Sequence, residues 1–205
     1  MFTGIVTAIG TIVEAHNTGD LHARIMCPLD PATITIGASI ACSGVCLTVV
    51  DRGGTVGDAW FAVDISGETL ACSAPAHWHI GAMLNLEPAL KLGDELGGHI
   101  VTGHVDGMGT VVELGAVGES LRLGISAPHA LAPFIAAKGS VTVDGVSLTV
   151  NTVADQNDGS CHFALNIIPH TARITTLGAL SAGDQVNLEI DVLARYLMRM
   201  QTLRG

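Results

Sequence analysis

Stretches rich in Val, Ile and Thr alternate along this chain with short clusters of Gly, Asp and Asn. Residues 5–13, 38–50 and 60–65 have this composition, and the same pattern returns in the second half of the chain. β-Branched residues favour strands, and short polar clusters that contain glycine mark the turns between strands. The pattern therefore predicts an all-β chain built as a barrel or a sandwich.

The last residues break this pattern. Between residues 192 and 200, apolar side chains recur at helical spacing, with arginines on the opposite face. This spacing predicts an amphipathic helix, and the first half of the chain has no equivalent of it. Such a helix either packs on its own domain or associates with its copies in an oligomer.

The chain also repeats itself. Residues 3–14 align with 102–113 with seven of twelve positions identical, and 39–49 align with 140–150 with six of eleven identical. Further matches join 61–65 to 163–167 and 81–87 to 183–189, while the offset drifts only from 99 to 102. Matches that keep order and register over four segments indicate a duplicated domain. We predict domains at 1–94 and 95–190, followed by a tail helix over 191–205.

Composition narrows the classes of partner. The 205 residues include 9 Lys and Arg against 19 Asp and Glu, a formal net charge of −10, which argues against nucleic acid and against an anionic membrane surface. Apolar residues make up 48% of the chain, yet no run approaches the roughly 18 residues of a membrane-spanning helix. The first residues lack the basic segment of a signal peptide, so none is expected, and the five irregularly spaced cysteines favour reduced thiols in a cytoplasmic protein. Only 14% of residues are charged, which fits a surface partly covered in an oligomer.

The five cysteines point to no disulfide framework. Their number is odd, their spacing is irregular and no Cys-x-x-Cys occurs, so we expect reduced thiols and no structural zinc site.

The two copies differ at positions with chemical potential. Cys46 aligns with Ser147, so one copy has a thiol where the other has a hydroxyl. Ile5 aligns with His104, an apolar side chain against an imidazole. These differences reflect either drift after duplication or two sites that hold one kind of molecule and treat it differently.

Several longer motifs are specific. They are MFTGIV at 1–6, GVCLTV at 44–49, GGHIVTGHVD at 97–106, DGVSLTV at 144–150, IPHT at 168–171 and TTLG at 175–178. In combination, and over essentially the whole chain, they resemble the riboflavin synthase family of the alpha-chain type. The resemblance implies two homologous six-stranded antiparallel Greek-key barrels plus a C-terminal α-helix that assembles a homotrimer.

The resemblance also implies a reaction. Two molecules of 6,7-dimethyl-8-ribityllumazine dismutate to riboflavin and 5-amino-6-ribitylaminopyrimidinedione by transfer of a four-carbon unit, the last step of riboflavin biosynthesis. The enzyme is then a transferase that needs no cofactor and no metal, with its site between the N-terminal barrel of one subunit and the C-terminal barrel of its neighbour. Association with lumazine synthase is a further expectation. The alternative is a non-catalytic lumazine- or flavin-binding carrier or antenna protein, which the presence of Cys46, His104 and Ser147 disfavours.

Roles follow from the resemblance for particular residues. His104 is the candidate general acid and base, and Ser147 and Thr149 donate hydrogen bonds or relay protons. Cys46 is either a nucleophile or a polar contact, and the N-terminal segment is expected to cover the N-terminal barrel. The implied substrate-binding residues are Phe2, Gly4, Ile5, Val6, Ser39, Leu47, Thr48, Asp64, Ile65, Ser66, Gly67, Glu68, Thr69, Gly103, Val105, Lys138, Leu148, Ile167, Ile168, Pro169, His170, Thr171 and Ala172. For Lys138, a solvated surface lysine is the competing interpretation.

One segment departs from the family. Residues 71–79 replace an Arg-Thr-Ser/Thr-Leu-Gly-like stretch that the second half nearly keeps at 173–178. His77-Trp78-His79 alternates like a strand, but no third ligand stands at a telling spacing, so we predict no metal site there.

Overall fold

A computed structural model describes residues 1–17 and 19–203, so the last two residues of the predicted tail helix lie outside the described part. The first half forms one closed antiparallel barrel in the order β1-β2-β5-β4-β3-β6. Its strands are β1 (Ala8–Asn17), β2 (Leu21–Cys27), β3 (Ser39–Cys42), β4 (Val45–Thr55), β5 (Asp58–Ile65) and β6 (Met83–Pro88).

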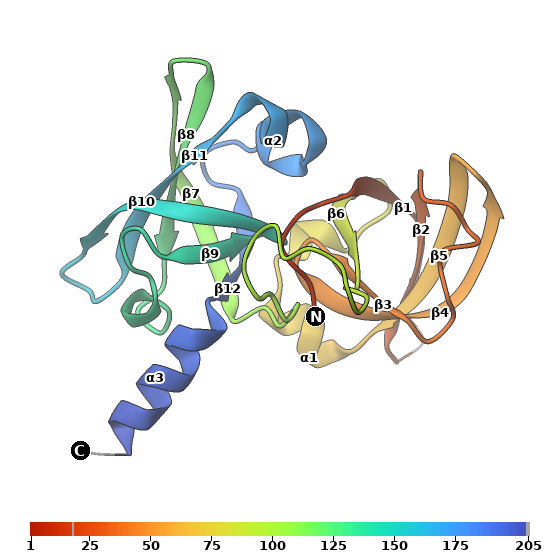
Figure 1. The fold of residues 1–205 in the computed structure, drawn as a ribbon, viewed down its shortest axis with the longest axis horizontal. Coiled ribbons are helices and arrows are strands. Elements are labelled where there is room, and N and C mark those ends of the chain that lie inside the picture. The colour runs from red at the N-terminus through yellow and green to blue at the C-terminus, as the bar shows by residue number, and fades with distance from the viewer. Residues whose placement is uncertain (18, 204–205) are drawn as a thin grey trace.

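The second half repeats this barrel, with the equivalent order β7-β8-β11-β10-β9-β12. Its strands are β7 (Gly107–Val117), β8 (Ser120–Ala127), β9 (Ser140–Val143), β10 (Val146–Asp155), β11 (Cys161–Ile167) and β12 (Gln185–Ile190). Figure 1 shows the two barrels side by side, with the N-terminus between them. The prediction of two six-stranded antiparallel barrels is confirmed.

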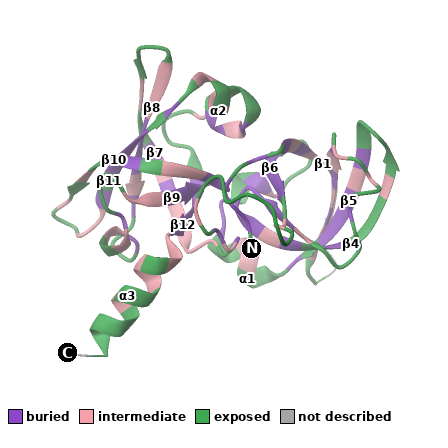
Figure 2. Cartoon of the chain, in the orientation of Figure 1, coloured by how far each residue is buried: buried purple, intermediate pink, exposed green. Residues whose placement is uncertain are grey.

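Each barrel closes around its own apolar core. Phe61, Ile25 and Leu84 are buried in the first, and Phe163 and Leu188 are buried in the second. Figure 2 shows buried segments along the strands of both barrels. Burial of each such side chain stabilises a fold by about 1.5–3 kcal/mol, so each barrel is stabilised by its own apolar core.

The predicted strand over residues 38–50 is wrong in one respect, because it is two strands joined by a tight turn. Ser43 and Gly44 both have positive φ, at 44° and 83°, as a two-residue type I′ hairpin requires. Asp144 and Gly145 form the same turn in the second barrel, at 44° and 81°. The tips of the two hairpins meet, since a Cβ on Gly44 would lie 2.9 Å from the backbone nitrogen of Gly145.

Short helices follow β5 and β11, namely α1 (Gly67–Cys72) and α2 (Pro169–Ile174). The predicted tail helix is present as α3 (Val192–Thr202), which Asp191 caps by accepting a hydrogen bond from the Leu193 backbone N–H. An ion pair of 2.7 Å between Arg195 and Asp106 fixes α3 to the second barrel. Figure 2 shows that α3 is largely exposed, and its exposed residues include the large side chain of Tyr196. Within the described part of the chain, no helix has the length and apolar character needed to cross a membrane.

Candidate functional site

The segment that precedes the first strand of each barrel crosses to the other barrel. Phe2 and Val101 pair as an antiparallel bridge, with N–H···O distances of 2.7 and 3.0 Å. Beyond this bridge, Val6 joins the core of the C-terminal barrel, and Val105 packs against the core of the N-terminal barrel. The expectation that the N-terminal segment covers the N-terminal barrel is therefore wrong for residues 4–6. The crossing also explains why the first strand begins at Ala8 rather than at residue 5.

Two buried glutamates fix these crossing segments. Glu87 accepts hydrogen bonds from the backbone N–H and hydroxyl of Thr3, both at 2.7 Å, and from the Gly4 N–H at 2.9 Å. Glu189 does the same for the equivalent atoms of residues 102 and 103 and also binds the backbone N–H of His104. Burial raises the pKa of both carboxyl groups, while these hydrogen bonds oppose that rise.

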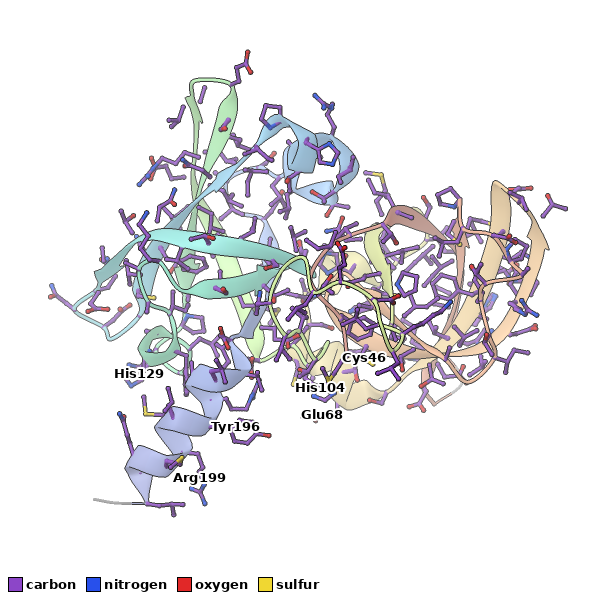
Figure 3. The ribbon with its side chains drawn as sticks, viewed as in Figure 1. Cys46, Glu68, His104, His129, Tyr196 and Arg199 are labelled. Carbon is purple, nitrogen blue, oxygen red and sulfur yellow. The ribbon has the colours of Figure 1, made fainter. Side chains whose placement is uncertain are left out.

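The first candidate pocket lies on the N-terminal barrel. It is a cavity of about 310 Å³ lined by Val45, Cys46, Glu68, Thr69, Cys72, Gly103, His104 and Val105. Thus the imidazole from the second half of the chain faces the thiol from the first half, which alignment of the repeats does not reveal. Figure 3 shows Cys46, Glu68 and His104 beside one another at α1. The backbone continues this arrangement, because Cys46 donates its N–H to the Gly103 carbonyl at 2.8 Å.

The second candidate pocket is the quasi-symmetric counterpart on the C-terminal barrel. It measures about 130 Å³ and is lined by Gly4, Ile5, Val6, Val146, Ser147, His170, Thr171, Ile174 and Thr175. Here the crossing segment brings Ile5 to Ser147, and the Ser147 N–H binds the Gly4 carbonyl at 2.8 Å. A Cβ on Gly4, whose φ is +76°, would lie 2.5 Å from the Ser147 Cβ, so only glycine permits this close approach.

Behind Ser147 lies a histidine to which the sequence analysis assigned no role. His99 Nδ1 is 2.7 Å from the Ser147 Oγ, and its Nε2 is 3.3 Å from the Thr142 Oγ1. Thr142 and Ser147 stand opposite each other in the β9–β10 ladder, so one imidazole bridges both hydroxyls. Burial lowers the pKa of His99, and the negative charge of Asp191 opposes this only in part. A neutral imidazole can accept one proton and donate another, which makes the trio a short proton path.

The equivalent place on the N-terminal barrel is apolar. Phe2 is fully buried and packs with Ala41, Cys46 and Ala89. The alignment of the repeats matches these three positions to Thr142, Ser147 and Asp191. The thiol is therefore backed by an aromatic ring where the hydroxyl is backed by an imidazole.

Other predicted residues lie in the barrel walls. The side chains of Leu47, Ile65 and Ile167 are buried in the two cores, so they can offer a ligand only backbone atoms. Leu148 is half-buried against the core of the C-terminal barrel. The threonines at 48 and 149 are exposed on β4 and β10.

The remaining predicted residues surround the two helices or lie apart from the pockets. Ser66 caps α1 by accepting the Thr69 N–H, Gly67 begins that helix, and Asp64 pairs with His22 at 2.7 Å. Ile168 and Pro169 open α2, and Ala172 packs against the core.

Two further predicted residues, Ser39 and Lys138, also lie outside the two cavities. Ser39 lines a separate cavity of about 190 Å³ beside Ile34 and Lys91. Lys138 is exposed in a turn at φ +68°.

The comparisons with known proteins agree with this architecture. The lumazine binding domain family matches residues 3–89 and again residues 102–191. The riboflavin synthase of Brucella abortus (strain 2308) is 49% identical over 205 residues, which cover 98% of each chain. That of Photobacterium phosphoreum is 42% identical over 202 residues, covering 98% of this chain and 88% of the relative. Among solved structures, LumP complexed with riboflavin superposes with a TM-score of 0.78 at 25% identity, over 93% of this chain and 99% of that one.

Proposed function

This chain belongs to the riboflavin synthase family of lumazine-binding proteins, and from that premise we propose that it makes riboflavin from two molecules of 6,7-dimethyl-8-ribityllumazine. One molecule donates a four-carbon unit to the other, so the enzyme is a transferase, and the second product is 5-amino-6-ribitylaminopyrimidinedione. The observation that carries the proposal is the pocket built twice in one chain. A reaction between two copies of one substrate needs two similar sites that treat their ligands differently.

The chemistry asks for orientation and for proton transfer rather than for a cofactor. The C7 methyl of the lumazine is acidic, because its anion delocalises into the ring, and the substrate pair serves as its own donor and acceptor. Holding two flat rings in register supplies much of the rate acceleration, since it converts an encounter into an internal reaction. The remaining task is to move protons, which general acid–base groups perform.

In the C-terminal pocket, we assign this task to Ser147 with His99. The Ser147 Oγ accepts a proton from the C7 methyl and passes its own hydroxyl proton to the His99 Nδ1, 2.7 Å away. The electron pair of the broken C–H bond delocalises from the exocyclic carbon into the ring, and this carbon then bonds to the second lumazine. His99 later gives its proton back through Ser147 to the reacting pair, which restores both side chains. In the N-terminal pocket, His104 acts directly, because it lines the cavity itself.

The role of Cys46 divides into two testable forms. As a nucleophile, its thiol adds to C7 of a bound lumazine; as a polar contact, it only orients the ring. Cys46→Ser keeps a polar group of similar size and removes most of the nucleophilicity. Retention of nearly full turnover by Cys46→Ser would assign the contact role, and a loss of several hundredfold would assign the nucleophile role.

Assembly into a homotrimer is part of the proposal. The two cavities of one chain share no lining residue among those described, so one chain does not bring two substrates into one cavity. α3 supports assembly, because it exposes the apolar residues Leu193, Tyr196, Leu197 and Met200. A chain that ends at Asp191 should sediment as a monomer while the full chain sediments as a trimer. A truncated chain that remains trimeric would remove α3 from the interface.

The test of the activity is direct. Purified full-length protein incubated with 6,7-dimethyl-8-ribityllumazine should produce one riboflavin for every two lumazines consumed, followed by flavin fluorescence and chromatography. A carrier would bind the lumazine tightly and leave it unchanged, and that result would replace the enzyme with the alternative function. Cytoplasmic location and association with lumazine synthase stay predictions.

A further inference from the structure

The two barrels meet in a buried polar network that nearly obeys the symmetry of the duplication. From the last strand of the C-terminal barrel, the Asn187 amide donates to the Ser43 carbonyl at 2.8 Å and accepts the Ala74 N–H at 2.7 Å. From the N-terminal barrel, the Asn85 amide makes the two equivalent bonds, because it donates to the Asp144 carbonyl and accepts the Thr176 N–H. Each barrel thus holds the hairpin tip of the other and the segment that follows the other's short helix.

One charged contact breaks this symmetry. The first half has Ser43 at the hairpin tip, whereas the second half has Asp144, whose side chain is only 1% exposed. Its carboxylate accepts the Asn187 N–H at 2.8 Å and lies 3.5 Å from the His77 Nε2. His77 belongs to the segment that departs from the family, and the repeat places Ala179 at its equivalent position. A buried carboxylate needs such a partner, because an uncompensated charge in the interior is costly.

The segment around His77 leads directly to the N-terminal pocket. It forms a 3-10 turn (Pro75–His77) rather than the alternating strand that the sequence suggested. The Ser73 hydroxyl accepts the Trp78 Nε1–H at 2.8 Å and donates to the Thr69 carbonyl at 2.6 Å. Thr69 belongs to α1, which contributes Glu68, Thr69 and Cys72 to the cavity. A continuous chain of contacts therefore runs from Asp144 in one barrel to the pocket wall of the other.

We infer that His77 is a positioning residue for the N-terminal pocket: its contact with Asp144 fixes the segment after α1 to the C-terminal barrel and so holds α1 against the cavity. The inference rests on the proposed function only in taking this cavity as a lumazine and flavin site. Because Ala179 makes no such contact for α2, the C-terminal pocket does not depend on His77. The second half of the chain lacks the histidine–carboxylate contact. This agrees with the location of His77 in residues 71–79, the segment that departs from the family.

The charge state of the pair gives the contact a pH dependence. Burial lowers the pKa of His77, but the charge and hydrogen bonding of the Asp144 carboxylate raise it by more, so the net shift of the pKa is upward. Among the described residues, the groups that face this imidazole are the Asp144 carboxylate, the Asn187 amide nitrogen at 3.2 Å from Nδ1, and the Trp78 ring in a T-shaped arrangement. An ion pair of this kind is present in full below about pH 6.5, the ordinary pKa of histidine, and is lost as the pH rises through the raised value.

The experiment measures riboflavin binding to the two pockets of the full-length protein separately. Riboflavin bound in the N-terminal cavity should protect the Cys72 thiol, which lines this cavity, from iodoacetamide, and mass spectrometry of the Cys72 peptide then gives the affinity there. Quenching of flavin fluorescence gives total binding, and the difference gives the C-terminal pocket. Labelling is normalised to the unliganded protein at each pH.

We expect His77→Ala to lower the riboflavin affinity of the N-terminal pocket about 10-fold and to leave that of the C-terminal pocket within a factor of two. His77→Gln should recover part of the loss, because its amide N–H still reaches toward Asp144. The riboflavin affinity of the wild-type N-terminal pocket should fall between pH 6 and pH 9, and His77→Gln should abolish this fall because glutamine does not titrate. The matched control is His79→Ala, since His79 is exposed and its Nδ1 lies 3.0 Å from the carbonyl of its own neighbour Ile80.

Three results would overturn the inference. Equal N-terminal affinities in the wild type and His77→Ala would remove the positioning role. Equal weakening of both pockets would mean that His77 supports the fold in general rather than α1. A wild-type protein that binds no riboflavin would overturn the proposed function and this inference with it, whereas the first two results leave the proposed function standing.

Discussion

The two pockets of this chain share a backbone frame and differ in what stands behind the reactive atom. In the N-terminal pocket, the Cys46 thiol is backed by the buried ring of Phe2. In the C-terminal pocket, the Ser147 hydroxyl is backed by His99, which also reaches Thr142. The two copies share the turns, the glutamates and the crossing segments, and they differ in one wall, which is apolar in the N-terminal pocket and polar in the C-terminal pocket.

This difference in the side chain next to the reactive atom determines which groups can transfer protons in each pocket. A hydroxyl with a pKa far above 7 becomes a useful proton carrier only when a base adjoins it, and His99 supplies that base. In the N-terminal pocket, the apolar ring of Phe2 occupies the equivalent place beside Cys46. The imidazole of this pocket therefore lies on the cavity side of the thiol. The crossing segment brings His104 there from the second half of the chain. Each pocket therefore depends on both halves, although each barrel has its own core.

The largest effect should come from removing the imidazole in front of the thiol. His104→Ala should lower kcat about 100-fold to 10,000-fold, the usual contribution of a general acid–base group, while lumazine affinity changes only a few-fold. Steady-state riboflavin formation and lumazine titration measure the two quantities. His129→Ala is the control, because His129 is an exposed histidine that contacts the Gly159 carbonyl far from both cavities. A kcat above a tenth of the wild-type value in His104→Ala would contradict this role.

Removing either member of the C-terminal pair should have a smaller effect, about 100-fold in kcat, and the two losses should not add. If Ser147 and His99 act as one unit, the double variant Ser147→Ala/His99→Ala should be no slower than the slower single variant. Turnover assays on the wild type, the two single variants and the double variant complete this double-mutant cycle. Multiplicative losses would show that the two side chains act separately.

The same pair has a signature in pH. Burial lowers the pKa of His99, so the imidazole stays unprotonated, and able to accept a proton, to a pH below its ordinary value of about 6.5. The acid limb of kcat/KM that belongs to this group should therefore lie below 6.5 in the wild type and disappear in His99→Gln. An unchanged limb in His99→Gln would assign that ionisation to another group.

Much of the fold could be predicted from the sequence, because the repeated segments mark most strands twice, although β2 and β8 lie outside them and the six-stranded barrel came from the family resemblance. The missed hairpin has a simple cause: Cys42 and Val45 are both apolar, so composition does not change across the turn. Only the left-handed backbone of Ser43-Gly44 separates the two strands, and Ser-Gly is a weaker turn signal than Asp-Gly in the second half.

The candidate site was harder to predict, because a sequence pattern does not say which core a side chain enters. Val6 is apolar whether it packs on its own barrel or on the other, and only the tertiary structure places it in the C-terminal one. The same ambiguity left the pocket that His104 enters undetermined and left His99 unnoticed. The Asp144-Gly145 dipeptide between Thr142 and Ser147 was the available signal, since a hairpin turn there places the two hydroxyls on one face, as the β9–β10 ladder does.

The smallest effect concerns a turn that the two halves build from different residues. Lys138 has φ +68° where the first half has Gly37 at φ +84°, and both donate their N–H to an equivalent carbonyl, of Val150 and Val49, at 2.7 and 2.8 Å. Glycine adopts this conformation without strain, whereas a side chain costs about 1 kcal/mol there, and such strain often persists at functional positions.

We therefore expect Lys138→Gly to raise the free energy of unfolding by about 0.5 kcal/mol and Gly37→Lys to lower it by about 1 kcal/mol, both measured by denaturant titration. If Lys138 contacts the substrate, as the family resemblance implies, the stabilised Lys138→Gly should also show a higher KM, which separates binding from strain. A variant that gains stability and keeps its KM would identify Lys138 as a solvated surface lysine. A variant that loses stability would mean that the lysine side chain makes a stabilising contact that outweighs the strain of its backbone.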